Sequence, residues 1–198
     1  GGRYHNFKDF IAFPEIGSAK LLNPSLPALP QKDLEGVSSI MDVIKKKDVV
    51  CFYPFQKFDY VIDLLRQAAI DPNVTTIKIN IYRVASNSKV INALINAVRN
   101  GKDVTVLIEL RARFDEQNNI SWSEVLEAEG VKVSFGLAGL KIHSKLILIK
   151  RKEGRTEKTY VHVGTGNFHE KTAKIYSDVS LLTSDKRITS EIEKVFEF

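Results

Sequence analysis

Residues 139–167 decide the fold, and they read GLKIHSKLILIKRKEGRTEKTYVHVGTGN. Within this stretch two apolar, β-capable runs, at 146–149 and 160–163, flank a charged connection with Gly154 near its middle. Two such runs around a polar, glycine-containing connection predict a β-hairpin. Folding the hairpin about Gly154 places the start of its first strand beside the end of its second.

The two ends that meet in this hairpin carry polar groups. His143 and Lys145 lie at the start of the first strand, while Gly164, Thr165 and Asn167 follow the second. A histidine, a lysine and the N–H groups of a glycine-rich loop then converge on one rim. The hairpin therefore predicts an anion-binding site.

The composition is that of a globular protein with a mild basic excess. The 198 residues are 43% hydrophobic and 27% charged, with a net charge of +5 and a pI of about 9.2, which favours an anionic partner. No apolar run approaches the ~20 residues of a membrane span, and the start shows no signal-peptide pattern. The single cysteine, Cys51, excludes an internal disulfide, fits a reducing compartment and indicates a core position.

The first part of the chain differs from the rest. We expect residues 1–47 to be a connector and the tail of a preceding domain, because prolines cannot occupy regular helices or central strands. The pattern at 190–198 is helical up to the last residue, so both ends predict a fragment of a longer polypeptide. Four prolines fall within 17 residues: Pro14, Pro24, Pro27 and Pro30.

Residues 48–198 alternate between strand-like and helix-like patterns. Such alternation predicts a single α/β domain, in which a mixed β-sheet is flanked by helices and the first strands are parallel. A capping-box spacing at Ser121 predicts the start of the third helix. The predicted strands beside the hairpin are 48–53, 74–82, 104–110, 131–135 and 175–182, and the predicted helices are 59–70, 88–100, 121–130 and 190–198.

Basic residues follow two successive predicted strands. Arg83 and Arg113 would lie at the carboxyl edge of the sheet, where ligands bind in open α/β folds. If the strand after His143 runs antiparallel, then His143, Lys145 and the loop 164–167 reach the same edge. One guanidinium group can bind two phosphate oxygens at once, and a neutral imidazole near pH 7 is a competent nucleophile. This combination predicts phosphoryl chemistry.

Structural alternatives stay open for each group. A histidine beside an apolar strand is commonly structural, Arg83 and Arg113 could be surface charges, and the glycines could only shape a turn. Convergence of several such residues on one edge favours a site. The remaining histidines are interpreted as structural: His5, His162 and His169.

The motif of residues 143–145, followed by 164–167, resembles half of a phospholipase D-type site. That pattern is H-x-K-x4-D followed by G-S/T-x-N. The chain departs from it at one position, because residue 150 is lysine instead of aspartate. This departure argues against a generic phosphodiesterase.

A closer resemblance covers nearly the whole chain. It is to the first C-terminal domain of the long-chain bacterial polyphosphate kinases, which have the phospholipase D fold. The first matching stretch resembles the end of that family's middle domain. The matching stretches are GGRYHNFKDF (1–10), YPFQKFDYVIDLLRQAAIDPNV (53–74), IKINIYRVASNSKVINALINAVRNGKDVTVLIELRARFDE (77–116), GLKIHSKLILI (139–149) and VHVGTGNFHEKTAKIYSDVSLLT (161–183).

The resemblance implies an ATP:polyphosphate phosphotransferase. The terminal phosphate of ATP would pass reversibly to inorganic polyphosphate through a phosphohistidine at His143. Arg83 and Arg113 match the family's Mg²⁺-phosphate site. Since arginine has no lone pair for Mg²⁺, we expect both to contact phosphates that carry the metal. Tyr176 matches a nucleotide-contacting tyrosine.

The motif also implies phosphate contacts from Lys145 and Asn167, with Gly164 in the donor loop. Positioned cations stabilise a phosphoryl group in flight. The second ring nitrogen of the nucleophile needs an acceptor. With no aspartate at 150, Asp178 is the candidate orienting carboxylate, and its alternative is an ordinary carboxylate at a strand end.

The chain holds one H-x-K motif that is followed by G-T-G-N, whereas a phospholipase D-type site needs two such motifs. In the resembling family the second half comes from a following C-terminal domain. We therefore expect the fragment to fold, to bind phosphate or nucleotide weakly and to have little kinase activity alone. Two alternatives stay open: a homodimeric phosphodiesterase or nuclease of the same fold, and a non-catalytic polyanion-binding module.

The resemblance also implies the partners. These are ATP or ADP, polyphosphate and the remaining domains of a full-length enzyme that forms a homo-oligomer, with no nucleic acid. We expect a cytoplasmic protein and leave peripheral association with the membrane open.

Overall fold

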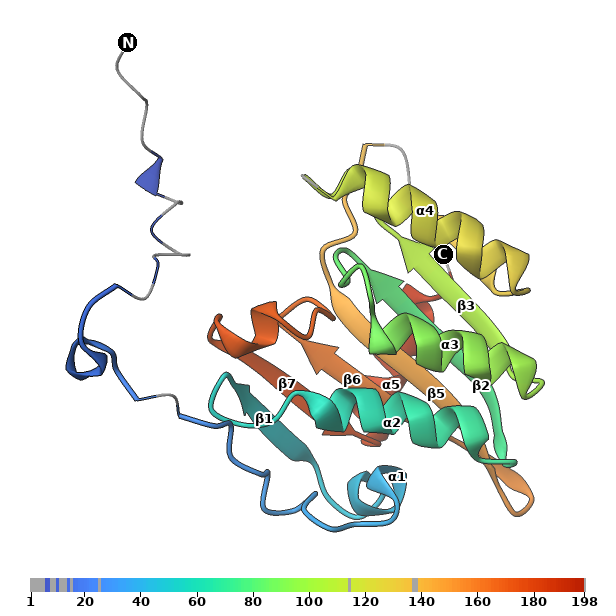
Figure 1. Cartoon of the computed structure of the whole chain (residues 1–198). Helices are drawn as coiled ribbons and strands as arrows, with labels where there is room; N and C mark the ends of the chain where they lie inside the picture. The colour runs from blue at the N-terminus through green and yellow to red at the C-terminus, as the bar shows by residue number, and fades with distance from the viewer. Residues whose placement is uncertain are drawn as a thin grey trace.

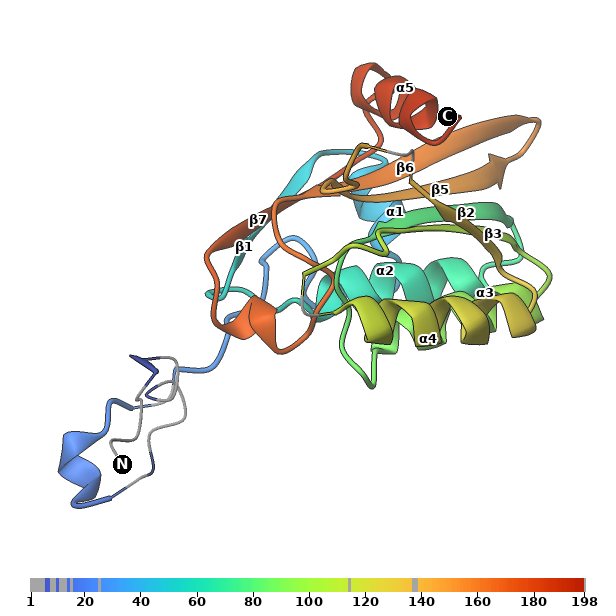
Figure 2. The same ribbon diagram turned by 90° about the horizontal axis from the view of Figure 1, so that it is seen from above.

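The computed structural model describes residues 6–7, 10, 14, 16–24, 26–113, 115–136 and 139–197. Within these residues, one seven-stranded mixed sheet carries α2, α3 and α4 on one face and α5 on the other (Figures 1 and 2). The strands are β1 (Val49–Tyr53), β2 (Val74–Ile81), β3 (Asp103–Ile108), β4 (Lys132–Phe135), β5 (Lys145–Glu153), β6 (Thr156–Gly164) and β7 (Asp178–Thr183). The helices are α1 (Ile40–Ile44), α2 (Asp59–Ile70), α3 (Lys89–Arg99), α4 (Glu116–Ala128) and α5 (Lys186–Val195), with 3-10 turns η2 (Ala19–Leu21) and η3 (Thr172–Lys174).

The strand order is β1-β7-β6-β5-β2-β3-β4. β2, β3 and β4 pair in parallel, and every other neighbouring pair is antiparallel. β1 runs in the same direction as β2 but lies at the far edge, beside β7. The predicted hairpin is confirmed as β5 and β6, with Gly154 in its turn at φ 65°. The predicted antiparallel pairing of β5 with the parallel strands is also confirmed.

The core lies between the sheet and helices α2 and α3. Alternation along β2 points Ile77, Ile79 and Ile81 into this layer, where all three are buried. Burying an isoleucine side chain contributes roughly 1.5–3 kcal/mol, so these three side chains stabilise the sheet substantially. On the other face α5 packs against β5 and β6.

The third helix corrects a prediction from the sequence. α4 begins at Glu116, five residues before the expected start at Ser121, and its N-cap residue is Asp115. The capping-box spacing at Ser121 indicates a start there, but the helix already includes Asn119. Its side chain is buried and donates to the carbonyl oxygens of Tyr82 and Glu109 at 3.0 and 2.8 Å. A polar residue thus occupies the inner face of the helix.

Two further predicted boundaries are wrong. The last strand, β7, begins at Asp178, because residues 172–174 form the turn η3 before it. The last helix, α5, begins at Lys186, where Asp185 caps it by accepting from the Arg187 N–H at 2.9 Å.

Part of the segment predicted as a connector packs into the core. Ile40, Met41 and Ile44 of α1 are buried in the same cluster as the strands. The division between residues 1–47 and 48–198 stays a prediction. His5 and the start of the first matching stretch lie outside the described residues. No helix in the described ranges is long and apolar enough to cross a membrane.

Candidate active site

Strand register brings the predicted site residues to one edge of the sheet. Lys145 at the start of β5 pairs with Gly164 at the end of β6, and Gly164 pairs with Ser180 of β7. Asp178, where β7 begins, pairs with Tyr53 at the end of β1. The carboxyl ends of β2, β3 and β4 lie at this same edge (Figure 1). The sequence therefore predicted correctly that these residues meet at one edge of the sheet.

His143, Lys145 and Tyr82 form the centre of the site. The His143 ring meets the Tyr82 ring edge-on, with 4.9 Å between centroids. The Nζ of Lys145 donates a hydrogen bond to the His143 carbonyl oxygen and lies 5.3 Å from the Tyr82 ring centroid. Sequence reasoning missed Tyr82, although an aromatic residue between the end of a strand and Arg83 was the available signal.

The electrostatics of this centre favour a neutral imidazole. His143 is exposed, and the charge of Lys145, partial burial and the charge of Lys141 together lower its pKa. Lys145 is only 3% exposed, and this burial lowers its pKa, while Asp178 opposes the shift and Arg83 adds to it. A lowered histidine pKa leaves the ring unprotonated near pH 7, which is the nucleophilic form.

The two predicted arginines come from adjacent loops. Arg83 forms an ion pair with Asp115, and its Nη2 donates to the Arg113 carbonyl oxygen at 2.8 Å. The Arg83 guanidinium also lies 5.9 Å from the Tyr82 ring. Arg83 thus reaches the centre of the site, and the backbone of Arg113 lies beside it.

The chemistry of these donors decides how Mg²⁺ would fit. No group of three or more His, Cys, Asp or Glu residues within the described part of the chain could hold a metal ion. Guanidinium groups have no lone pair for a cation. The residues present therefore do not fit a protein-bound Mg²⁺, and an ion here would take its ligands from phosphate oxygens and water.

The loop after β6 is fastened to the start of β7. Thr165 Oγ1 donates to Asp178 Oδ1 at 2.7 Å and accepts from the Val179 N–H at 3.0 Å. Gly166 lies so close that a Cβ there would be 2.8 Å from the Cβ of Asp178. Asn167 Oδ1 is buried and has no hydrogen-bond partner among the described residues. The loop therefore presents an unsatisfied amide oxygen.

Two predicted roles are not reflected in contacts. The residues that the structure describes include no hydrogen bond between His143 and Asp178, whose Oδ1 accepts from Thr165. Tyr176, after η3, is 62% exposed. The orienting role of Asp178 and the nucleotide contact of Tyr176 stay predictions.

A buried histidine lies directly beneath the rim. His162 is 1% exposed, and its Nε2 is 2.7 Å from Ser180 Oγ. Burial lowers its pKa to about 4. The ring packs against Phe168, with 5.2 Å between centroids. The His162 side chain therefore packs on the buried side of the loop 164–167 and is inaccessible to solvent.

One cavity, of about 410 Å³, opens beside the site. It lies between the segment around His143 and the end of α5, with His143, Ser144 and Asn80 on its polar side and Phe135, Ile142 and Phe196 on its apolar side.

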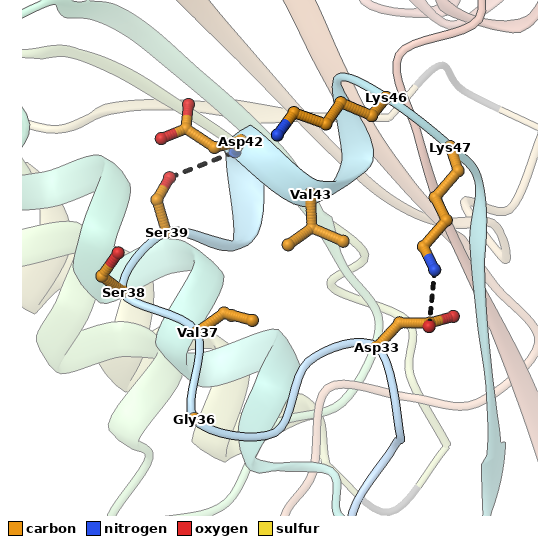
Figure 3. A pocket seen from close by; sticks show the side chains of 9 residues that line it. All are labelled: Asp33, Gly36, Val37, Ser38, Ser39, Asp42, Val43, Lys46 and Lys47. Atoms are coloured by element: carbon orange, nitrogen blue, oxygen red, sulfur yellow. Dashed lines mark hydrogen bonds and ion pairs between the residues drawn. The ribbon is translucent and has the colours of Figure 1, made fainter.

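A larger pocket, of about 580 Å³, lies between the loop 33–39 and one side of α1 (Figure 3). Two of its charges are paired, since Lys47 contacts Asp33 at 2.5 Å. Ser39 caps α1 by accepting from the Asp42 N–H. These residues precede β1, so the pocket lies at the edge of the sheet opposite His143.

Comparison with solved structures defines the class of fold. The structure is similar to Nuc, a phospholipase D family member from Salmonella typhimurium, with a TM-score of 0.58 and 17% identity over 76% of this chain and 91% of that chain. It is also similar to NucT from Helicobacter pylori, with a TM-score of 0.59 and 15% identity over 76% of this chain and 93% of that one. The fold is therefore phospholipase D-like, as predicted.

The family follows from closer relatives. The model of the polyphosphate kinase C-terminal domain 1 matches residues 39–198, and the chain belongs to this family. The crystal structure of polyphosphate kinase from Porphyromonas gingivalis matches with a TM-score of 0.82 and 38% identity over 98% of this chain and 33% of that one. Polyphosphate kinases from Vibrio parahaemolyticus and Escherichia coli K12 are 57% and 54% identical over the whole chain, which spans 28% and 29% of their lengths.

Proposed function

We propose that this chain supplies the nucleophilic half of a polyphosphate kinase active site. In that role His143 takes the terminal phosphate of ATP and passes it, reversibly, to inorganic polyphosphate. The observation that carries the proposal is the placement of His143, an exposed imidazole with a lowered pKa beside the cation of Lys145. Membership of the family supports the same substrates.

The proposed reaction has two in-line displacements. A lone pair of the His143 imidazole attacks the terminal phosphorus of ATP, an N–P bond forms, and the P–O bond breaks with its electron pair leaving on ADP. A terminal oxyanion of polyphosphate then attacks the same phosphorus, the N–P bond breaks, and the imidazole is restored. Charge accumulates on the equatorial oxygens, so fixed cations lower the barrier.

Lys145 and Arg83 are the cations that this chain can place near those oxygens. Arg113 would add a third contact from the neighbouring loop. Asp178 would orient the second ring nitrogen of His143, using lone pairs that Thr165 does not occupy. Mg²⁺ would enter with the phosphates of ATP. The full-length polypeptide would act as a homo-oligomer.

We propose further that the other half of the site lies in polypeptide beyond this chain. The chain holds a single H-x-K motif followed by G-T-G-N and spans less than a third of the relatives' length. The isolated chain should therefore show little polyphosphate synthesis, and robust synthesis by it would refute this part of the proposal.

A chimera tests the covalent step. In the E. coli relative, the matching segment would be replaced by this chain, to which it is 54% identical. Incubation with ATP labelled at the terminal phosphate should give an acid-labile, base-stable label on the protein. His143→Asn should abolish the label, and His169→Asn, at a second histidine of the chain, should retain it. A label that survives His143→Asn would overturn the proposal.

A homodimeric phosphodiesterase is the second candidate. The chain aligns with 91% of Nuc, so the fold alone is compatible with a small enzyme of that kind. Residue 150 opposes this, because Lys150 points a cation at Glu193, 3.3 Å away, where the motif has aspartate. Cleavage of bis(p-nitrophenyl) phosphate by a dimer of the isolated chain, lost in His143→Asn, would favour this candidate.

A further inference from the structure

We infer that two buried side chains, Glu109 and Asn80, are positioning residues that hold the backbone on both sides of His143. This inference deepens the proposed function, on which it rests for the use of His143. Neither side chain touches the His143 ring in the described contacts, so both would act through the segment that carries it.

Glu109 holds the residue before the nucleophile. It directly follows β3 and is 5% exposed. Its Oε2 accepts from the Ile142 N–H at 2.8 Å, and its Oε1 accepts from the Arg111 N–H at 2.7 Å. One carboxylate therefore ties the His143 segment to the loop that leads to Arg113.

Asn80 holds the residues after the nucleophile. It lies near the end of β2 and is 1% exposed. Its Nδ2 donates to Ser144, to the carbonyl oxygen and to Oγ at 2.7 Å. Its Oδ1 accepts from the Leu146 N–H at 2.5 Å. Together with Glu109, it brackets His143 within five consecutive residues, 142–146.

These bonds take the place of a β-ladder. The pairing of β2 with β5 extends to Ile79 and Ile147, and β5 itself begins at Lys145. Residues 141–144 therefore have no strand partner in the described structure. An unpaired segment would move freely unless side chains fixed its backbone.

One of these two residues, Glu109, is itself bonded to α4, as is Tyr82. Asn119 donates to the carbonyl oxygens of Glu109 and Tyr82. Tyr82 in turn contacts the His143 ring. The same buried network thus fixes the backbone of the nucleophile and the aromatic face against which its ring rests. Holding a reacting group in its productive position lowers the free-energy barrier of the reaction.

Isosteric substitutions isolate these roles. Glu109→Gln keeps the shape of the side chain but turns an NH₂ group toward one of the two N–H donors. Asn80→Asp keeps the acceptor for Leu146 and replaces the donor to Ser144 by a second oxygen. Glu124→Gln, at an exposed position of α4, is the matched control.

The test uses this chain alone and needs no enzyme activity. Amide hydrogen exchange would be followed at Ile142 and Leu146, and His143 would be phosphorylated chemically with phosphoramidate. ³¹P NMR then reports the ratio of the two ring-nitrogen products. Glu109→Gln should speed exchange at Ile142 about tenfold over Glu124→Gln and change that ratio. Asn80→Asp should change the ratio while Leu146 stays protected.

A folded Glu109→Gln variant whose Ile142 exchange and product ratio match Glu124→Gln would overturn the inference. If Glu109→Gln does not fold, Asn80→Asp decides: an unchanged product ratio would overturn the inference, and a changed ratio would support it. Failure of the proposed function appears elsewhere, as an unlabelled chimera, and leaves the exchange result standing.

Discussion

The parallel and antiparallel halves of the sheet contribute different things to the site. The antiparallel half, β5, β6, β7 and β1, carries Lys145, the glycine loop and Asp178, all above a buried layer that includes His162. The parallel half, β2, β3 and β4, ends in loops that carry Arg83 and Arg113.

The difference follows from how each half is connected. A hairpin brings two strand ends together through backbone pairing, so its groups have little freedom. A parallel strand is followed by a loop and a crossover helix, so the groups just past its end lie on a loop without strand pairing. We conclude that strand pairing positions the groups of the antiparallel half, while the parallel half adds the loop arginines and holds the segment around His143 through Asn80 and Glu109. Substitutions in the antiparallel half should therefore lower the free energy of unfolding. Substitution of a loop arginine in the parallel half should weaken anion binding.

The largest expected effect is on the pH dependence of stability, through His162. Its pKa is lowered to about 4 by burial, against an ordinary value of 6.5. Between these values the unfolded chain binds the additional proton, so stability is complete above pH 6.5 and falls as the pH decreases toward 4. The free energy of unfolding should drop by about 3 kcal/mol across this window.

Urea unfolding between pH 7.5 and 4.5 measures this drop. His162→Gln should lower the free energy of unfolding at pH 7.5 and flatten its dependence on pH. His169→Asn leaves His162 in place, so the pH dependence should stay unchanged. Carboxylates with a lowered pKa begin to contribute only below about pH 5. Burial alone would raise the pKa of Glu153, but bonds from Lys45, Tyr160 and Arg151 lower it to about 2. An unchanged dependence in His162→Gln would contradict the assignment.

Much of the fold was predictable because its signals are local. The hairpin, the alternating β2 and the amphipathic α2 and α3 each follow from a periodicity within a few residues. The start of α4 was not, because Asn119 finds its partners at the ends of two distant strands. A buried asparagine and a loop asparagine look the same until those strands are placed.

The meeting of the candidate site residues could also be predicted in part from the sequence. Sheet topology predicted that Lys145 and Gly164 would meet, and strand pairing confirms it. The roles of Tyr82, Glu109 and Asn80 were not predicted, because each depends on a contact with the segment around His143. Contacts between segments more than 30 residues apart leave no periodic trace in the sequence.

A smaller effect on stability is expected from a glycine-to-alanine substitution, which adds one methyl group, at the end of each half of the sheet. At Gly164, in the antiparallel half, a Cβ would lie 2.6 Å from Cε1 of the buried His162 ring. At Gly136, after β4, it would lie 2.8 Å from Cδ1 of Ile142, the flexible end of a side chain that can turn away. Gly164→Ala should therefore cost about 1–3 kcal/mol of unfolding free energy and Gly136→Ala under ~1 kcal/mol.

Urea unfolding at pH 7.5 compares the two variants directly. Neither glycine has a positive φ in the described backbone, so the alanine adds contact without backbone strain. A cost for Gly136→Ala equal to or above that for Gly164→Ala would show that the antiparallel half is not the more rigid one.

The smallest stability effect is expected at Arg83, where anion binding should change instead. Its ion pair with Asp115 is partly exposed, so Arg83→Gln should cost no more than about 1 kcal/mol. Arg66→Gln is the matched control, since Arg66 pairs with Asp63 at 3.3 Å on α2. Binding of tripolyphosphate to the chain at low salt, measured by calorimetry, should weaken about tenfold in Arg83→Gln only. Equal weakening in Arg66→Gln would mean that net charge, and not the loop after β2, attracts the anion.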